Sequence, residues 1–403
     1  MSFFLKIEYR FIRMLYAVDS RLVEFQGTFF ALKGEKTDGH LFLEEAAKKG
    51  AVCAYVEKSY AGNTFGMELF FVESPLGKLQ ELAMNRLQSA NPLVIGVTGS
   101  FAKTTTKEGI YAALSHHASC FKTPLNANSQ TGIPLAILNG YQDESIAIIE
   151  MGIEYQGEME RLASMVQPHI AIITRIDEAH LETLGSIEGI AINKGKIVHS
   201  RTQTLFIHDS VQPYLSYFPV NNLQVEIYGQ SDELLFEDIV DLCFRLQKRE
   251  GFPLVRPELP EVALRFEKIS HPKGTVILDC YNANPGSMRT FFEEQKKISW
   301  QGRRVAIIGE MGGLGEESEN IHLKVLSQIE SAFDVAFVIG SKARGMYDNL
   351  KSRDRKAFFA ENLEQLKLLI QNEVIPHDLV LVKGSNVNRL WEVAPCLQHI
   401  FST

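Results

Sequence analysis

The stretch that decides the fold is Leu93-Val94-Ile95-Gly96-Val97-Thr98-Gly99-Ser100-Phe101-Ala102-Lys103-Thr104-Thr105-Thr106-Lys107-Glu108. It begins with apolar residues, passes through small residues to Lys-Thr, and continues in a helical pattern over residues 107–114, which predicts a strand, a loop and a helix. Backbone N–H groups of such a loop, with the positive end of the helix, bind phosphate. Lys103 would reach the β- and γ-phosphates, and the hydroxyl of Thr104 would bind Mg²⁺.

The loop departs from the phosphate-loop pattern in two places. Ala102 stands where the pattern has Gly directly before Lys, and Gly96 is one residue out of place. Because Gly serves where φ is positive, we expect a negative φ at Ala102 and a methyl group turned away from the nucleotide. The open alternative is an ordinary strand-to-helix turn that contains Lys-Thr. The candidate nucleotide-binding residues are Gly96, Thr98, Gly99, Ser100, Ala102, Lys103, Thr104 and Thr105.

Length and composition indicate a globular protein of two or three domains. The chain has 403 residues, of which 45% are hydrophobic and 22% charged, and its net charge of −8 argues against a general nucleic-acid binder. Five scattered cysteines without a C-x-x-C pair suggest neither disulfides nor zinc and fit a reducing cytoplasm. Residues 1–16 do not resemble a signal peptide, and no apolar run is long enough to span a membrane.

The patterns divide the chain into three α/β units, expected to be domains of residues 1–90, 91–267 and 268–403. The first unit has strand patterns at 28–32, 51–56 and 69–72, and helical patterns at 41–49 and 76–89. Ser20 and Arg21 lie in one of its loops. They could bind an anionic ligand, or they could be a helix cap or turn with a solvated Arg.

Polar residues follow the strands of the second unit. Residues 146–150 predict a buried strand that ends in Glu150, and ligands lie at the carboxyl ends of strands in open α/β sheets. Glu150 is therefore a candidate Mg²⁺ ligand, with a plain strand-end Glu as the alternative. His180 follows a strand at 170–174 and could be a metal ligand, a base, or a cap or surface residue. Lys194 lies in a predicted helix at 187–199, with a solvated helix lysine as the alternative to a functional residue.

The third unit is Rossmann-like. Strand patterns occupy residues 275–279, 304–309, 335–340 and 379–382, and a helical pattern occupies 362–373. No G-x-G-x-x-G follows a strand, so a nicotinamide cofactor is not expected.

Together, these motifs resemble the Mur ligases, ATP-dependent amide-bond-forming enzymes of peptidoglycan synthesis. The resemblance covers nearly the whole chain, and it is greatest to the members that add D-alanyl-D-alanine to UDP-N-acetylmuramoyl-tripeptide. The matching stretches are Asp19-Ser20-Arg21, Thr98 to Thr105, Asn126 to Pro134, Glu150-Met151-Gly152, Ala179-His180-Leu181-Glu182, Lys194, Tyr281-Asn282-Ala283-Asn284-Pro285, Ser287-Met288, the stretch 309–315, His322 and Lys383-Gly384-Ser385.

The resemblance implies a small α/β UDP-binding domain, a central P-loop ATPase-type domain with a parallel sheet, and a C-terminal Rossmann-like domain. It implies that ATP phosphorylates the peptide carboxylate and that the amine of D-Ala-D-Ala attacks the acyl phosphate. It further implies a cytoplasmic enzyme, expected to be a monomer. The implied residues are Thr104, Glu150, His180 and a carbamylated Lys194 for Mg²⁺; Lys103, Glu150, His180 and Lys194 for catalysis; Asn282, Asn284 and Pro285 for the nucleotide; and Ser20, Arg21, Asn126, Asn128, Lys383 and Ser385 for the other substrates.

Three departures from the family pattern lie outside the loop. Lys196 stands where the family usually has Glu, Asn386 follows Lys383-Gly384-Ser385 where Arg is common, and residues 236–265 lack a recognisable closing segment of the central domain. A trimmed central domain is therefore expected. The alternatives to a working ligase are a diverged nucleotide-binding protein without ligase activity and a Mur ligase with another acceptor, while a kinase or a dehydrogenase is least supported.

Overall fold

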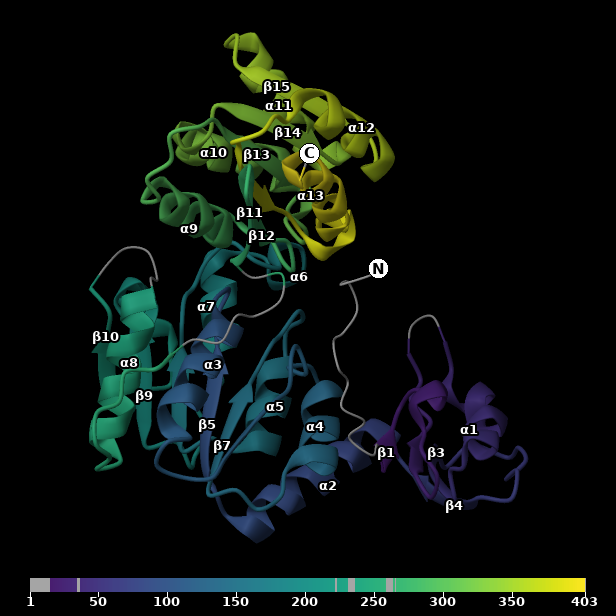
Figure 1. Ribbon diagram of the computed structural model, residues 1–403. Coiled ribbons are helices and arrows are strands. Elements are labelled where there is room, and N and C mark those ends of the chain that lie inside the picture. The colour runs from purple at the N-terminus through teal and green to yellow at the C-terminus, as the bar shows by residue number, and fades with distance from the viewer. Residues whose placement is uncertain are drawn as a thin grey trace.

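The computed structural model describes residues 15–34, 37–221, 223–230, 236–258, 264 and 266–402. These residues form three sheet-containing α/β domains, as the sequence predicts (Figure 1). Most of the segment compared with a signal peptide, residues 1–14, lies outside the described residues. In the described part of the chain, no helix is long and apolar enough to cross a membrane.

The N-terminal domain has a parallel sheet of four short strands in the order β1-β2-β3-β4. The buried side chains of Phe29, Leu43 and Val56 form part of its core. The chain leaves α1 through Gly50, whose φ of 110° is available to Gly without steric cost. Its elements are β1 (Tyr16–Ala17), β2 (Thr28–Phe30), α1 (Leu43–Lys49), β3 (Cys53–Glu57) and β4 (Glu68–Val72).

The central domain has a six-stranded parallel sheet in the order β10-β9-β8-β5-β7-β6. Every residue of β7, β8 and β9 is buried, because helices cover both faces of the sheet. Its elements are β5 (Leu93–Thr98), α3 (Lys103–Leu114), β6 (Cys120–Lys122), α4 (Gly132–Gly140), β7 (Ile146–Glu150), α5 (Glu158–Val166), β8 (Ile170–Ile173), α6 (Leu181–Leu184), α7 (Ile187–Gly195), β9 (Thr204–His208), β10 (Gln224–Tyr228) and α8 (Phe236–Arg249).

Helix α2 (Pro75–Ala90) connects the first two domains. It precedes the predicted domain boundary at residue 90, yet its Ala83 and Leu87 are buried in the core of the central domain with α4 and α5. A second connection joins β1 to α4, where Asn139 Oδ1 accepts the N–H of Tyr16 at 3.0 Å and Asn139 Nδ2 donates to the carbonyl of Tyr16 at 2.9 Å.

Helix α8 lies in the segment 236–265, where the sequence shows no recognisable closing segment of the central domain. Its apolar side chains, at the i, i+3, i+4, i+7 spacing of an amphipathic helix, are Ile239, Leu242, Cys243 and Leu246. They are buried in the same core as Ile110 and Ala113 of α3, so α8 closes this face of the sheet. The closing helix was not predicted because charged residues dominate the composition of the segment and obscure its apolar spacing.

The C-terminal domain has a six-stranded sheet in the order β11-β12-β16-β13-β14-β15, in which only the β11–β12 pair is antiparallel. Strand β11 begins one residue before the predicted start of the domain. The elements are β11 (Glu267–His271), β12 (Gly274–Asp279), α9 (Pro285–Lys296), β13 (Arg304–Gly309), α10 (Ser318–Ile329), β14 (Val335–Ile339), α11 (Arg344–Ser352), β15 (Lys356–Ala360), α12 (Leu363–Glu373), β16 (Leu379–Lys383) and α13 (Ala394–Ser402).

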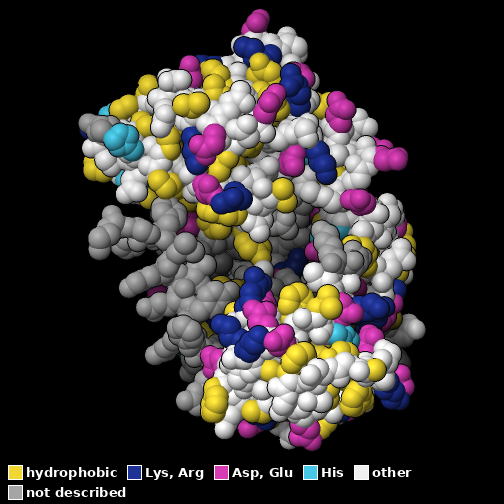
Figure 2. Space-filling view, turned by 90° about the vertical axis from the view of Figure 1, so that its right-hand side faces the viewer, with side chains coloured by type: hydrophobic (Ala, Val, Ile, Leu, Met, Phe, Trp, Pro, Cys, Tyr) yellow, Lys and Arg dark blue, Asp and Glu magenta, His cyan; other side chains and the backbone are white. Residues whose placement is uncertain are grey.

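The carboxyl ends of the central strands face the C-terminal domain. Across this boundary Lys324 Nζ lies 3.2 Å from Glu178 Oε1, and the N–H of Glu182 donates to the carbonyl of Gly313 at 3.3 Å. Figure 1 shows α6 and α7 directly beneath the C-terminal domain, with the N-terminal domain to one side. Figure 2 shows that the molecular surface is hollowed between the C-terminal domain above and the domains below.

Candidate functional site

The predicted strand, loop and helix are present as β5, residues 99–102 and α3. Helix α3 begins at Lys103, four residues earlier than the periodic pattern indicates, so its positive N-terminal end lies at the loop. Lys103 folds back over the loop and donates from Nζ to the carbonyl of Gly99 at 2.8 Å. Thr104 lies in the first turn of α3 and is buried, whereas Thr105 is partly exposed.

The backbone at Ala102 contradicts the prediction of a negative φ. Ala102 has φ 60° and ψ 6°, in the left-handed region where Gly is favoured. The conformation persists because neighbouring loop groups are fixed by tertiary hydrogen bonds. Thr174 Oγ1 donates to the carbonyl of Phe101 at 2.7 Å, and the N–H of Ser100 donates to the carbonyl of Arg175 at 2.7 Å. Ala102 thus adopts the backbone conformation that Gly would have at this position of the loop.

Gly96 does not join the loop, contrary to its inclusion among the nucleotide-binding candidates. It lies inside β5, where it pairs with β7 on one side and β8 on the other. A Cβ at this position would lie 3.1 Å from Met151 Sδ and 3.1 Å from Pro168 Cβ. Gly96 is therefore a packing residue of the sheet. Thr98, at the end of β5, is also buried, and its hydroxyl donates to the carbonyl of Met151 at 2.8 Å.

Glu150 occupies the predicted place at the carboxyl end of β7 and is 1% exposed. Asn128 Nδ2 donates to its Oε1 at 2.8 Å, which joins the Asn-containing loop to this carboxylate. The other oxygen, Oε2, makes no hydrogen bond and lies 3.6 Å from Lys107 Nζ. A buried carboxylate oxygen without a hydrogen-bond donor fits a hard cation such as Mg²⁺. Asn126, in the same loop, is exposed.

His180, Lys194 and Lys103 form a group of basic side chains close enough to influence one another electrostatically. Burial lowers the pKa of His180 to about 4, with smaller contributions from the charges of Lys194 and Lys103. Burial and the charge of Lys103 also lower the pKa of Lys194 well below its usual value. Lys194 is 1% exposed. A negatively charged group would stabilise these three basic side chains.

The structure describes no group of three or more His, Cys, Asp or Glu side chains placed to hold a metal ion. A magnesium site at the edge of β7 would therefore depend on hydroxyl and phosphate oxygens as well as Glu150. This is the usual coordination of Mg²⁺, which takes one or two protein carboxylates together with substrate phosphates and water.

The predicted C-terminal site residues fall into two groups. Asn282 is exposed, whereas Asn284 is buried: its Oδ1 caps α9 by accepting the N–H of Ser287 at 2.9 Å, and its Nδ2 donates to the carbonyl of Ser100 at 3.0 Å. Pro285, which follows, is the first residue of α9. Asn284 thus contacts the phosphate loop itself.

Lys383, predicted to bind substrate, is fully buried. Its Nζ donates to the carbonyl of Asn282 and lies 3.3 Å from Asp279 Oδ2. It supports the loop that carries Asn282. Ser385 is 6% exposed, and its hydroxyl donates to Asn388 Oδ1 at 3.3 Å.

Ser20 and Arg21 lie in the N-terminal domain. Ser20 Oγ donates to Glu45 Oε2 at 2.6 Å, and Arg21 is paired with Asp19 at 2.6 Å while remaining exposed to solvent. Their backbone forms a short 3₁₀ turn capped by Asp19, as the simpler of the two sequence interpretations predicts. The structure does not place these residues beside the phosphate loop.

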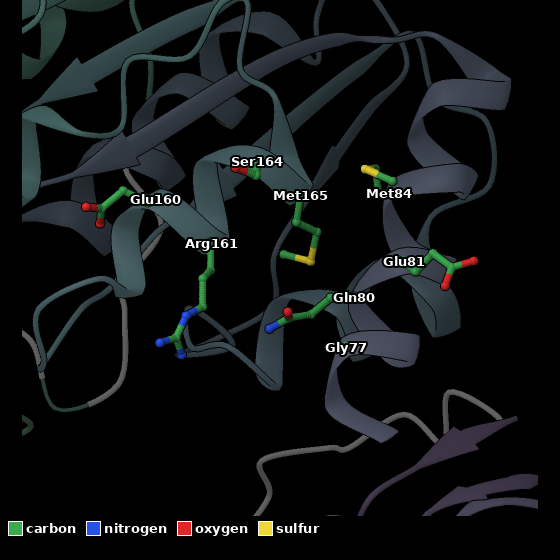
Figure 3. Close-up of a pocket in the computed structure, with 8 residues that line it drawn as sticks. All are labelled: Gly77, Gln80, Glu81, Met84, Glu160, Arg161, Ser164 and Met165. Carbon is green, nitrogen blue, oxygen red and sulfur yellow. The ribbon is translucent and has the colours of Figure 1, made fainter. Parts of the chain in front are cut away.

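A pocket of about 380 Å³ lies between α2 and α5 (Figure 3). Met84 lines it from α2 and Met165 from α5, while Glu81 and Arg161 lie on opposite sides of it. None of the predicted site residues lines this pocket. The residues that line it are Gly77, Gln80, Glu81, Met84, Glu160, Arg161, Ser164 and Met165.

Sequence reasoning did not assign a role to Lys107. Its side chain is fully buried, and Nζ donates to the carbonyls of Thr123 at 2.7 Å and Leu125 at 3.1 Å. Together with its position 3.6 Å from Glu150, these bonds fix the loop before Asn126 against α3. The sequence offers one indication of its role: Lys107 lies four residues after Lys103, so both side chains lie on one face of α3.

Two family models match the chain. The Mur ligase middle domain matches residues 97–242, and the Mur ligase, glutamate ligase domain matches residues 264–386. The chain is 36% identical to a UDP-N-acetylmuramoyl-tripeptide–D-alanyl-D-alanine ligase of Synechocystis, over 91% of this chain and 88% of the relative. It is 32% identical to the ligase of the same name from Treponema pallidum, over 94% and 93%.

Solved structures show the same fold. A MurF ligase from Thermotoga maritima in complex with ADP superposes with a TM-score of 0.82 at 24% identity, covering 97% of this chain and 98% of that one. MurF from Acinetobacter baumannii gives a TM-score of 0.83 at 24% identity, covering 95% and 93%. The chain belongs to the Mur ligase family of ATP-dependent ligases.

Replacing Ala102 by Gly tests the strained backbone of the loop. The variant should raise the free energy of unfolding of the central domain by about 1 kcal/mol, because Gly adopts a positive φ without the steric cost of Cβ. Ala112→Gly, within α3, is the control and should lower stability by about 1 kcal/mol. Urea unfolding measures both, and equal losses in the two variants would show that Ala102 is not strained.

Proposed function

We propose that the chain joins D-alanyl-D-alanine to UDP-N-acetylmuramoyl-tripeptide in peptidoglycan synthesis, with ATP converted to ADP and phosphate. The observation that carries the proposal is the group of His180, Lys194 and Lys103 beside the phosphate loop, opposite the C-terminal domain. The ammonium of Lys103 at the N-terminal end of α3 favours a polyanion at this place. The names of the relatives supply the identity of the substrates.

The reaction must bring ATP close to a carboxylate, which is a poor acyl donor until it is phosphorylated. In the proposed mechanism, the carboxylate attacks the γ-phosphorus and ADP leaves. The amine of D-Ala-D-Ala then attacks the acyl carbon, and phosphate leaves as the amide forms. Lys103 would release its bond to Gly99 and stabilise the charge that develops on the transferring phosphoryl group. The hydrogen-bonded loop would hold the nucleotide in place.

Mg²⁺ fits the residues at the carboxyl ends of β5 and β7. Thr104 and Glu150 would hold one ion, and Glu150 Oε2 is the buried oxygen available for it. His180 would help to hold a second ion, because its low pKa keeps the imidazole neutral at pH 7. When bound, Mg²⁺ neutralises phosphate charge. Asn128 orients Glu150 through its 2.8 Å hydrogen bond.

Carbamylation of Lys194 fits its surroundings. CO₂ reacts with a neutral amine, and burial together with Lys103 favours the neutral form of Lys194. The carbamate would replace a buried neutral amine by an anion beside His180 and Lys103. This change would supply a negatively charged oxygen that could help to hold Mg²⁺.

The other substrates are assigned by domain. We propose that Ser20 and Arg21 lie near the UDP end of the peptide substrate, Asn282 near the nucleotide, and Asn126 and Ser385 near the peptide and the acceptor. The exposed positions of Arg21, Asn126 and Asn282 suit ligand contact. A cytoplasmic location fits the five free cysteines. A monomer is consistent with all these residues coming from one chain.

Lys103→Ala should remove catalysis while leaving the fold intact. We expect turnover with ATP, UDP-muramoyl-tripeptide and D-Ala-D-Ala to fall by about 10²- to 10³-fold, because one charge that stabilises the transferring phosphoryl group is lost. Product formation followed by mass spectrometry measures the effect. Lys248→Ala, at an exposed position of α8, is the control and should keep full activity. Turnover retained by Lys103→Ala would refute the role of this loop.

Lys194→Met should abolish carbamate formation. With ¹³C-enriched bicarbonate, the unaltered protein should give one slowly exchanging carbamate resonance by ¹³C NMR, since a buried neutral amine reacts and is shielded from water. The signal should be lost in Lys194→Met and kept in the neighbouring Lys196→Met, whose ammonium is paired with Glu160 at 2.5 Å. A resonance that survives Lys194→Met would assign the carbamate elsewhere.

A further inference from the structure

We propose that the first turn of α9 positions the phosphate loop, so that high-affinity nucleotide binding requires the C-terminal domain to be docked through Asn284, Gly286 and Arg289. The inference rests on the chain being an ATP-dependent ligase, and it does not depend on the identity of the acceptor. These three residues lie in the C-terminal domain, and the groups that they contact belong to the central domain.

Within the central domain, the phosphate loop is fixed by the segment that follows β8. Ser100 Oγ donates to the carbonyl of Asp177 at 2.9 Å and accepts the N–H of Asp177 at 2.9 Å. Thr174 Oγ1 holds the carbonyl of Phe101 at 2.7 Å. We call residues 174–177 the strap. Because the strap binds the loop backbone at consecutive residues, a displacement of the strap changes the loop.

The first turn of α9 contacts both the loop and the strap. Asn284 Nδ2 donates to the carbonyl of Ser100 at 3.0 Å in a buried position. Arg289 Nη2 donates to Asp177 Oδ2 at 2.6 Å, and Asp177 is only 5% exposed. Hydrogen bonds that involve charged groups in buried positions contribute more than neutral bonds at the surface. The C-terminal domain therefore holds the loop directly and through the strap.

Gly286 lets α9 approach this closely. A Cβ on Gly286 would lie 2.3 Å from Asp177 Oδ2 and 2.4 Å from Phe101 Cε1. Asp177 cannot easily yield, because its Oδ1 accepts the N–H of Glu178 at 2.8 Å while Oδ2 is bound to Arg289. Phe101 is covered on another side by the guanidinium of Arg175, 5.6 Å from the ring centre. Any larger residue at position 286 would therefore push against Asp177 and Phe101 of the central domain.

Gly286→Ala is the direct test, with binding of ADP measured by titration calorimetry on the full chain. The added methyl group should weaken ADP binding about tenfold, which corresponds to loss of one charge-assisted contact. Gly345→Ala is the matched control, because Gly345 is also the second residue of a helix in the C-terminal domain and its Cβ would meet only Glu319, at 3.4 Å. Its ADP affinity should change by less than about twofold.

The Gly→Ala substitutions distinguish an effect on ADP binding from an effect on folding. Alanine is a better helix former than glycine, so neither variant should lower the urea midpoint of the C-terminal domain. Asp177→Ala and Arg289→Ala should each weaken ADP binding, and the double variant should be no weaker than the worse single variant, because the two residues act as one contact. Tight ADP binding by Gly286→Ala, or additive effects in the double variant, would overturn the proposal.

Discussion

The placement of His180, Lys194 and Lys103 together at one edge of the central sheet, with Lys194 buried, is the constraint on which the rest of the site depends. Burial keeps Lys194 from being a stable cation, and Lys103 adds to that effect for both Lys194 and His180. Such a site is costly unless anions fill it. The phosphate loop, the carboxylate of Glu150 and the hollow beneath the C-terminal domain are the features that would bring negative charge to it (Figure 2).

The strand, loop and helix around Lys103 and the strand that ends in Glu150 could be predicted, because local apolar periodicity and turn composition determine them. The φ of Ala102 could not, since hydrogen bonds from residues more than 70 positions away fix the loop backbone. Helix α8 was missed although its apolar spacing is helical, because charge dominated the interpretation of that segment. The presence of α8 removes one argument for a non-catalytic, trimmed relative.

Contacts between domains were the least predictable part of the site. Arg289 and Asp177 are 112 residues apart, and no local pattern relates them. Asn284 and Lys383 were predicted to contact ligands, yet in the structure both are buried and bind protein backbone, one at the phosphate loop and the other beneath Asn282. The motif positions were informative, but the division between ligand contact and structural support depends on burial, which sequence alone does not determine. For the same reason, the predicted boundary at residue 90 separates α2 from the central core that it helps to form.

The most direct test of the account is phosphate release from ATP by the purified protein, with UDP-muramoyl-tripeptide and D-Ala-D-Ala added singly and together. Phosphate release is expected only when both substrates are present, since the acyl phosphate must form on one substrate and be attacked by the other. Release that is independent of the second substrate, or no release although ATP binds, would contradict ligation and leave a nucleotide-binding protein with the fold of a ligase.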